Sequence, residues 1–135
     1  MTSPFVVDAN DVEGFTPPHH ESTTSRELVN PDRGSDRIVF RISELAPGGR
    51  DSWHAHESSE QLLYILDGHA TFWVGKPGDD DESSATRHEL SPESFVYIPE
   101  QAYHRLRVTG DEPLRAIAIW VPPYESFDEW ESSDG

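Results

Sequence analysis

Three histidines and a glutamine have the types and spacing of a metal site. His54 and His56 are two residues apart, and alternate side chains of an extended strand project from the same face. Gln61 begins the apolar segment QLLYIL, which predicts the next strand. A hairpin of this strand with the histidine strand would bring both imidazoles and the side-chain oxygen of Gln61 to a single ion. His104 begins a later strand-like segment. Three histidines with one oxygen donor suit a first-row transition metal. The alternative is a pair of surface histidines on a polar strand, but the third histidine and the ordered spacing favour metal.

The segment from Gly48 to Gly68 resembles the first motif of the cupins. In that motif a glycine is followed, after five residues, by His-X-His, then by a glutamate and, six residues later, by a second glycine. Gly48, His54, His56 and Gly68 match it position by position. The resemblance therefore identifies His54 and His56 as metal ligands.

The glutamate position of the motif falls on a glutamine. Counting back six residues from Gly68 reaches Gln61, whereas Glu60 would leave seven. Strand alternation agrees, because Gln61 shares a face with Leu63 while Glu60 lies on the other face. We expect Gln61 to be the fourth ligand, with Glu60 as the alternative.

A second cupin motif is matched in part between residues 93 and 108. Pro99 and His104 match, so the resemblance makes His104 the third histidine ligand. Glu93 and Gln101 replace the two glycines of the motif, and Val108 replaces its asparagine. Since such glycines serve turns with unusual backbone angles, we expect a locally altered turn here.

The arrangement of strands predicts an all-β protein. Short apolar segments with alternating polarity are separated by turn residues from Ile38 to Val121, and this pattern is typical of an antiparallel sandwich or barrel. The cupin resemblance implies a jelly-roll (double-stranded β-helix) barrel. We predict a single domain over 1–135, with a core at about 35–122, an irregular arm and first strands over 1–34, and an acidic tail over 123–135.

Several reactions are compatible with the resemblance, because cupins include dioxygenases, decarboxylases, isomerases and lyases. The preferred hypothesis is an oxidoreductase of the dioxygenase type that acts on a small organic substrate able to chelate the metal. No carboxylate or further histidine has the spacing of a general base beside the ligands, which favours metal-centred chemistry. The alternatives are a metal-dependent isomerase or lyase, and a non-catalytic cupin that binds or senses a small molecule. The ion could be iron, manganese, nickel, copper or zinc.

Aromatic side chains could line the pocket of the barrel and favour an apolar or aromatic substrate, although each could equally be ordinary core. The candidates are Phe40, Phe72, Phe95, Tyr103 and Trp120. The strand from Leu62 to Leu66 is apolar on both faces, and Ile117, Ile119 and Val121 share one face of the last strand. These faces predict a homodimer formed by two packed sheets.

The charge balance excludes some partners. The chain has 26 acidic and 10 basic residues, a formal net charge of −16, and a single lysine, Lys76. Such a surface repels nucleic acid and anionic membranes, and it suggests adaptation to high salt. The sequence has no cysteine, so disulfides and thiolate ligands are excluded. With no signal peptide and no apolar segment of membrane-spanning length, we expect a cytoplasmic protein.

Overall fold

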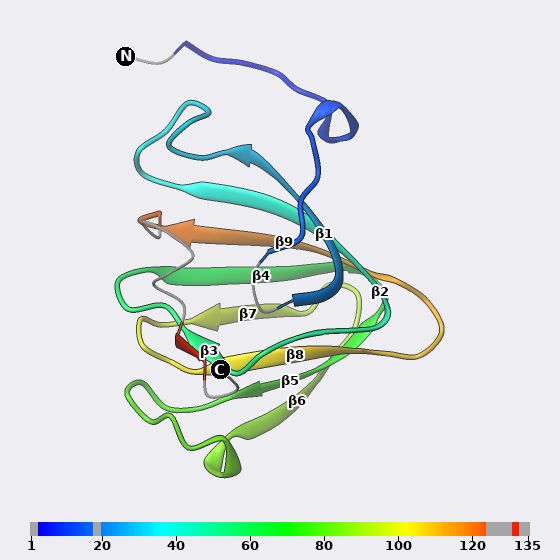
Figure 1. Cartoon of the computed structure of the whole chain (residues 1–135), viewed down its shortest axis with the longest axis vertical. Helices are drawn as coiled ribbons and strands as arrows, with labels where there is room; N and C mark the ends of the chain where they lie inside the picture. The colour runs from blue at the N-terminus through cyan, green and yellow to red at the C-terminus, as the bar shows by residue number, and fades with distance from the viewer. Residues whose placement is uncertain (1–2, 18–19, 124–130, 133–135) are drawn as a thin grey trace.

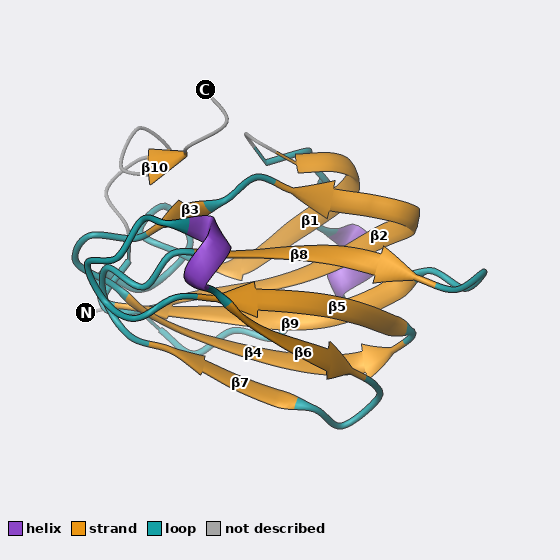
Figure 2. Cartoon of the chain, turned by 90° about the horizontal axis from the view of Figure 1, so that it is seen from below, coloured by secondary structure: helices purple, strands orange, loops and turns teal. Residues whose placement is uncertain are grey.

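Strands make up nearly all of the regular secondary structure in the computed structural model, which describes residues 3–17, 20–123 and 131–132. Figure 2 shows only two short helical turns, η1 (Ala9–Asp11) and η2 (Glu82–Ser84), and the described residues contain no α-helix. The predicted all-β class is confirmed. The predicted acidic tail lies largely outside the described residues. The strands are β1 (His20–Val29), β2 (Val39–Asp51), β3 (His54–Ala55), β4 (Glu60–Asp67), β5 (His69–Val74), β6 (Thr86–Leu90), β7 (Phe95–Ile98), β8 (His104–Thr109), β9 (Leu114–Val121) and β10 (Glu131–Ser132).

The strands form one antiparallel sheet that curls into a half-barrel. Its order is β10-β3-β8-β2-β9-β4-β7, with β1 added on β2 and β5 placed between β8 and β6. Figure 1 shows the two resulting walls, β1-β2-β9-β4-β7 and β8-β5-β6. The long strand β2 belongs to both, since its end pairs with β8 at Arg50 and Arg107. A curled sheet of this kind encloses side chains from both walls.

The expected hairpin between the histidine strand and the next strand is wrong. β3 pairs with β8, where His54 lies opposite His104, whereas β4 pairs with β7 and β9. The turn at Gly68 likewise leads from one wall to the other, because β4 and β5 are not paired. Gly68 has φ +89°, and a Cβ there would lie 2.4 Å from the carbonyl oxygen of Pro113. Only glycine therefore fits this crossing without displacing the backbone.

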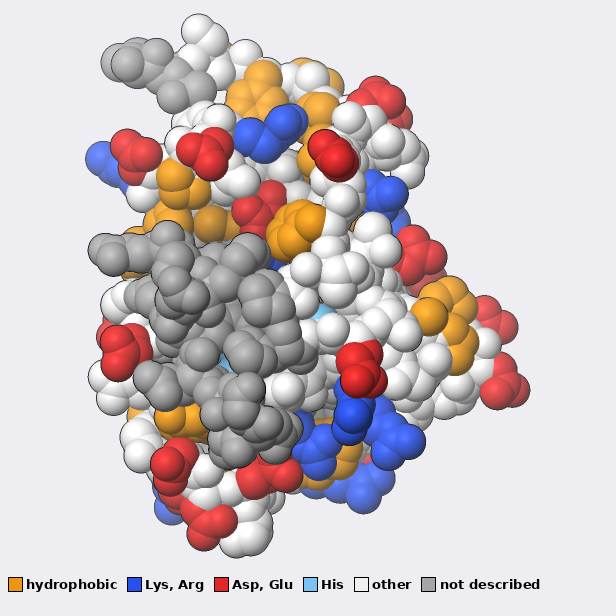
Figure 3. Space-filling view, viewed as in Figure 1, with side chains coloured by type: hydrophobic (Ala, Val, Ile, Leu, Met, Phe, Trp, Pro, Cys, Tyr) orange, Lys and Arg blue, Asp and Glu red, His pale blue; other side chains and the backbone are white. Residues whose placement is uncertain are grey.

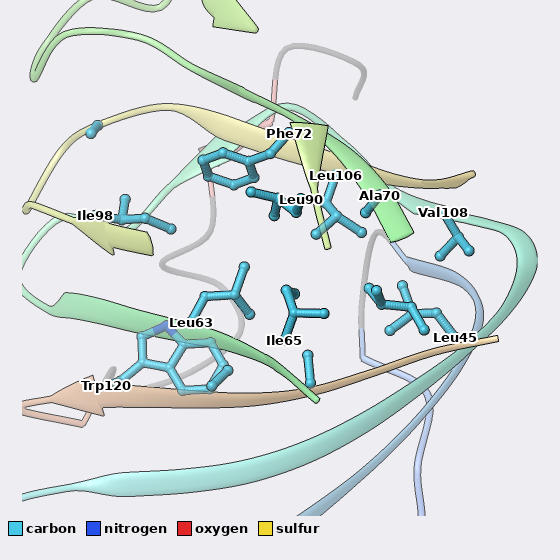
Figure 4. Close-up of a cluster of buried hydrophobic side chains, with 14 of the residues drawn as sticks. Leu45, Leu63, Ile65, Ala70, Phe72, Leu90, Ile98, Leu106, Val108 and Trp120 are labelled. Atoms are coloured by element: carbon cyan, nitrogen blue, oxygen red, sulfur yellow. The ribbon is translucent and has the colours of Figure 1, made fainter. Parts of the chain in front are cut away.

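The core fills the space between the walls. Leu63 and Trp120 point from one wall toward Phe72 and Leu106 of the other, as Figure 4 shows, and all are buried. Alternation along β4 and β9 produces this inner surface, since every second residue of each strand is buried.

Two strands direct aromatic residues outward, contrary to the sequence prediction. In β2 the inward set is Val39 and Arg41, while Phe40 is half-buried on the other face. In β7 the inward residue is Ile98, and Phe95 is 60% exposed. Because side chains alternate with a period of two, choosing the wrong parity moves every residue of a strand to the opposite face.

The surface carries both signs of charge. Figure 3 shows acidic side chains spread over one face, with basic side chains at several places and the densest group in the lower part of the view. Within the described chain, no helix is both long and apolar enough to cross a bilayer.

Candidate metal centre

Three buried histidines meet on the inner surface of the half-barrel. His54 lies on β3, His56 follows it, and His104 begins β8. One ring nitrogen of each lies within 4.8 Å of the others. The ring centroids of His54 and His104 are 4.3 Å apart, and those of His54 and His56 are 5.3 Å apart. A single ion could contact all three imidazoles.

Backbone carbonyl groups orient two of the rings. Nδ1 of His54 donates to the carbonyl oxygen of Ser52 at 2.6 Å, and Nδ1 of His104 donates to that of Ala102 at 2.9 Å. A carbonyl only accepts, so the proton of each neutral ring is on Nδ1 and the lone pair is on Nε2. Histidine ligands of metals are commonly held in this way.

Burial keeps the three imidazoles neutral. It lowers the pKa of His54 and of His56 well below the ordinary value, and neighbouring histidines lower both further. Burial also lowers the pKa of His104 to about 4, against the opposing effect of its bond to Ala102. Metal binding requires neutral imidazole, so the rings are in the ligating protonation state at neutral pH.

Gln61 and Glu60 lie on opposite faces of β4. Gln61 is 8% exposed and lines the same cavity as His54 and His104. Glu60 is exposed and accepts a hydrogen bond from the hydroxyl of Tyr97 on the outer surface. Of these two candidates, only Gln61 faces the histidines.

The donor atoms fit a divalent transition ion. Among the described residues, Nε2 of His104 and Oε1 of Gln61 are buried without a hydrogen-bond partner. Leaving buried polar atoms without partners costs free energy, and an ion would compensate both of them. Three neutral imidazole nitrogens and one amide oxygen suit iron, manganese, nickel, copper or zinc.

A cavity of about 70 Å³ adjoins this cluster. Its apolar side is formed mainly by β4, β8 and β9, including Leu63, Leu106 and Trp120. Polar side chains from β1 and β2 form the other side: His20, Thr23, Arg41, Ser43 and Asp51. The enclosed space therefore combines an apolar wall with several hydrogen-bonding groups.

Of the aromatic candidates, Phe72 and Trp120 line this cavity, and the other three do not. Phe40 and Phe95 face outward from their strands. Tyr103 is half-buried and stacks on Trp53, with ring centroids 5.8 Å apart. It supports the buried Trp53, whose Nε1 donates to the carbonyl oxygen of Asp80 at 2.9 Å.

The cavity also contains an acid–base pair that the sequence analysis did not find. Asp51 and His20 are register partners across β1 and β2, and both side chains are 12% exposed. The expectation that no candidate general base stands beside the ligands is therefore wrong. A signal was present in Asp51, which ends β2 three residues before His54, whereas its pairing with His20 depends on the register of β1 against β2.

Arg41 is buried in the same cavity wall and is neutralised locally. Its Nε and Nη2 donate to Glu27 at 3.1 and 2.6 Å, and its guanidinium lies 4.5 Å from the centre of the Trp120 ring. The ion pair joins β1 to β2, and the cation–π contact links Arg41 to β9.

The two positions where the second motif has glycine keep the backbone form that glycine would adopt: Glu93 lies in the turn before β7, and Gln101 in the turn that leads to His104. Glu93 has φ +76° and Gln101 has φ +66°, both in the left-handed region. The amide of Gln101 donates to the carbonyl oxygen of His56 at 2.8 Å, which ties this turn to the histidine segment. The expectation of an altered turn is wrong, because non-glycine residues accept the strain of the same conformation.

Comparison with known proteins identifies similar sequences. A family described as "Cupin domain" matches residues 41–121. An uncharacterized protein of Methanocaldococcus jannaschii is 28% identical over 104 residues, which are 76% of each chain. The "Polyketide synthase CurC" of Streptomyces cyaneus is 26% identical over 115 residues, covering 84% of this chain and 67% of that protein.

Solved structures share the fold. The polyketide cyclase RemF from Streptomyces resistomycificus superposes with a TM-score of 0.75 at 21% identity, covering 97% of this chain and 86% of that one. A formate complex of Lactobacillus farciminis oxalate decarboxylase also has a TM-score of 0.75, at 26% identity. This match covers 98% of the present chain but 36% of the decarboxylase chain. These matches confirm the predicted jelly-roll barrel.

Proposed function

This chain belongs to the cupin family, and from that premise we propose that it is a metal-dependent enzyme acting on a small organic molecule in its cavity. The observation that carries the proposal is the group of three buried, neutral histidines beside that cavity. We propose His54, His56, His104 and Gln61 as the ligands. Bound there, a divalent ion would supply Lewis acidity toward a chelating oxygen of the substrate, undiminished by any anionic ligand.

The size of the cavity limits the substrate. Pockets for drug-sized ligands usually enclose roughly 300–1,000 Å³, well above the about 70 Å³ found here. The cavity suits a compound of a few heavy atoms that places oxygen near the histidines and carbon against the apolar wall. A small oxygenated acid or carbonyl compound has this character.

Proton transfer is the reaction type that the geometry supports best. The preference for a dioxygenase rests on the lack of a general base in the sequence pattern, whereas in the structure Asp51 and His20 are acid–base groups in the cavity. A metal-assisted isomerase or lyase uses such a group to move a proton on the substrate. We therefore place this reaction type first.

A dioxygenase remains the second candidate, and the neutral donor set favours it. Three imidazoles and the amide of Gln61 add no negative charge, which favours a higher reduction potential for a redox metal. A purely ligand-binding cupin receives less support, because Gln101 keeps the left-handed backbone of the replaced glycine in the turn at His104. Oxygen uptake with small chelating acids and carbonyl compounds separates the two enzyme candidates.

Metal content tests the proposed ligand set. We expect about one equivalent of a transition metal by mass spectrometry in untagged protein, loss of that metal in His56→Ala, and weaker retention in Gln61→Ala. His88→Ala is the matched control, because His88 is exposed on β6 and should leave metal content unchanged. Protein that holds no metal after reconstitution with each candidate ion would refute the proposal.

We also propose that two copies associate through the outer face of β2-β9-β4-β7. In register across this face, apolar side chains form two rows that contain no acidic residue: Phe40, Ile119, Leu62 and Tyr97 in one, and Ile42, Ile117, Tyr64 and Phe95 in the other. Acidic residues outnumber basic ones 26 to 10 in this chain, so two adjoining rows without an acidic side chain are unusual on it. A second copy offers the same apolar surface.

Sedimentation in high salt tests this association. Wild type should sediment as a dimer, whereas Ile119→Asp should sediment as a folded monomer because it places a charge in the centre of the face. Thr86→Asp adds the same charge on an exposed position of β6 and should remain dimeric. Monomeric wild type would exclude the proposed face.

A further inference from the structure

Asp51 occupies a position that its structural contact alone does not explain. Its Oδ1 accepts the backbone N–H of Leu106 at 2.6 Å, which joins the end of β2 to β8. This bond supplements the single paired position between the two strands, Arg50 with Arg107. An asparagine would accept the same N–H without placing an ionisable group in the barrel, so the contact with Leu106 does not require a carboxyl group.

The second carboxyl oxygen faces an acid–base partner. Oδ2 of Asp51 lies 3.7 Å from Nε2 of His20, its cross-strand partner. The His20 ring lies 6.3 Å, centre to centre, from the ring of His54. Both Asp51 and His20 line the cavity, and both keep partial contact with solvent. The pair thus connects the candidate metal centre with water.

The surroundings of Asp51 suit proton exchange near neutral pH. Burial raises the pKa of its carboxyl to about 7, while the Leu106 N–H and the charge of Arg105 act in the opposite direction. His20 faces it from β1, the charge of Arg105 acts on it from β8, and His54 of β3 and His104 of β8 line the same cavity. A general acid–base group works best when its pKa is close to the working pH.

We propose that Asp51 is the catalytic acid–base residue of this cavity, that its substrate is a small enolisable carbonyl compound, and that His20 exchanges the proton with solvent. The inference rests on the proposed function, and it specifies the chemistry of the same site. Oδ2 of Asp51 removes a proton from the carbon next to the substrate carbonyl. The C–H bond breaks, an O–H bond forms on Asp51, and the electron pair shifts to the carbonyl oxygen. Return of a proton to the same or a neighbouring atom completes an exchange or an isomerisation that needs no oxidant.

Hydrogen–deuterium exchange at carbon tests this assignment directly. Metal-loaded protein is incubated in D₂O with pyruvate, hydroxyacetone, glyceraldehyde and acetoacetate, and loss of the C–H signals is followed by proton NMR. We expect wild type to accelerate exchange in at least one compound, and Asp51→Asn to lower that rate by at least about 100-fold. His20→Gln should lower it less and shift its pH profile, because His20 acts through Asp51.

The controls separate this inference from the proposed metal site. Asp51→Asn should keep the metal content and the circular dichroism spectrum of wild type, since asparagine still accepts the Leu106 N–H. Wild-type rates in Asp51→Asn, or no exchange in any probe by the metal-loaded protein, would overturn the inference. Exchange that needs Asp51 in protein lacking metal would support the inference while refuting the proposed metal enzyme.

Discussion

Replacing Asp51 by asparagine should change how the stability of the protein depends on pH. The folded pKa of Asp51 is about 7, compared with 3.8 for the ordinary carboxyl group. Between these values the folded state binds a proton that the unfolded state releases, so rising pH destabilises the wild type. Asparagine cannot ionise, so the variant should not lose stability in this way.

The magnitude follows from the two pKa values. A shift from 3.8 to about 7 corresponds to about 4 kcal/mol, at 1.36 kcal/mol per pH unit. Part of this loss of unfolding free energy occurs below pH 5, so about 2.5 kcal/mol of it should occur between pH 5 and pH 8. The unfolding free energy of Asp51→Asn relative to the wild type should therefore rise by about 2.5 kcal/mol from pH 5 to pH 8.

Urea denaturation of chelator-treated protein at fixed ionic strength is the assay. The lowered pKa values of His54, His56 and His104 destabilise the fold as pH falls below about 6.5, but these groups are present in both proteins and cancel in the difference. A difference in unfolding free energy that stays constant from pH 5 to pH 8 would refute the reasoning. It would mean that Asp51 is ionised in the folded protein as readily as in the unfolded one.

Further substitutions and conditions test the fold and the surface. Gly68→Ala should lower the free energy of unfolding by at least about 3 kcal/mol, because left-handed strain adds to a backbone clash of the new Cβ. Gly48→Ala, at φ +80° with open space around it, should lower it by about 1 kcal/mol, and chemical denaturation measures both. Arg41→Ala should cost about 3–5 kcal/mol in the same assay because it removes the counter-ion of the partly buried Glu27 carboxylate, and Arg50→Ala, from an exposed ion pair, should cost less than about 1 kcal/mol. If the acidic surface reflects adaptation to high salt, the Tm should rise steeply between about 0.1 M and about 1 M NaCl, because the screening length falls from about 10 Å to about 3 Å. An unchanged Tm in calorimetry would exclude this adaptation.

Local sequence patterns were enough to place several strands and to nominate the candidate ligands. The alternating apolar segments predicted between Ile38 and Val121 are strands in the structure, among them β7 (Phe95–Ile98) and β9 (Leu114–Val121). Alternation also distinguished Gln61 from Glu60, because the two faces of one strand follow from the backbone itself. The motif spacing pointed to His54, His56 and His104, which the structure brings together.

Strand pairing and orientation were decided only by the tertiary structure. The histidine segment pairs with β8 rather than with its neighbour in sequence, and β2 turns Arg41 rather than Phe40 toward the interior. The approach of His20 to Asp51 likewise depends on the register of β1 against β2. A pattern of alternating residues describes the two faces of a strand, but it does not say which face is inside or which strand lies beside it. Those choices depend on packing between segments far apart in the chain, and they created the acid–base side of the cavity.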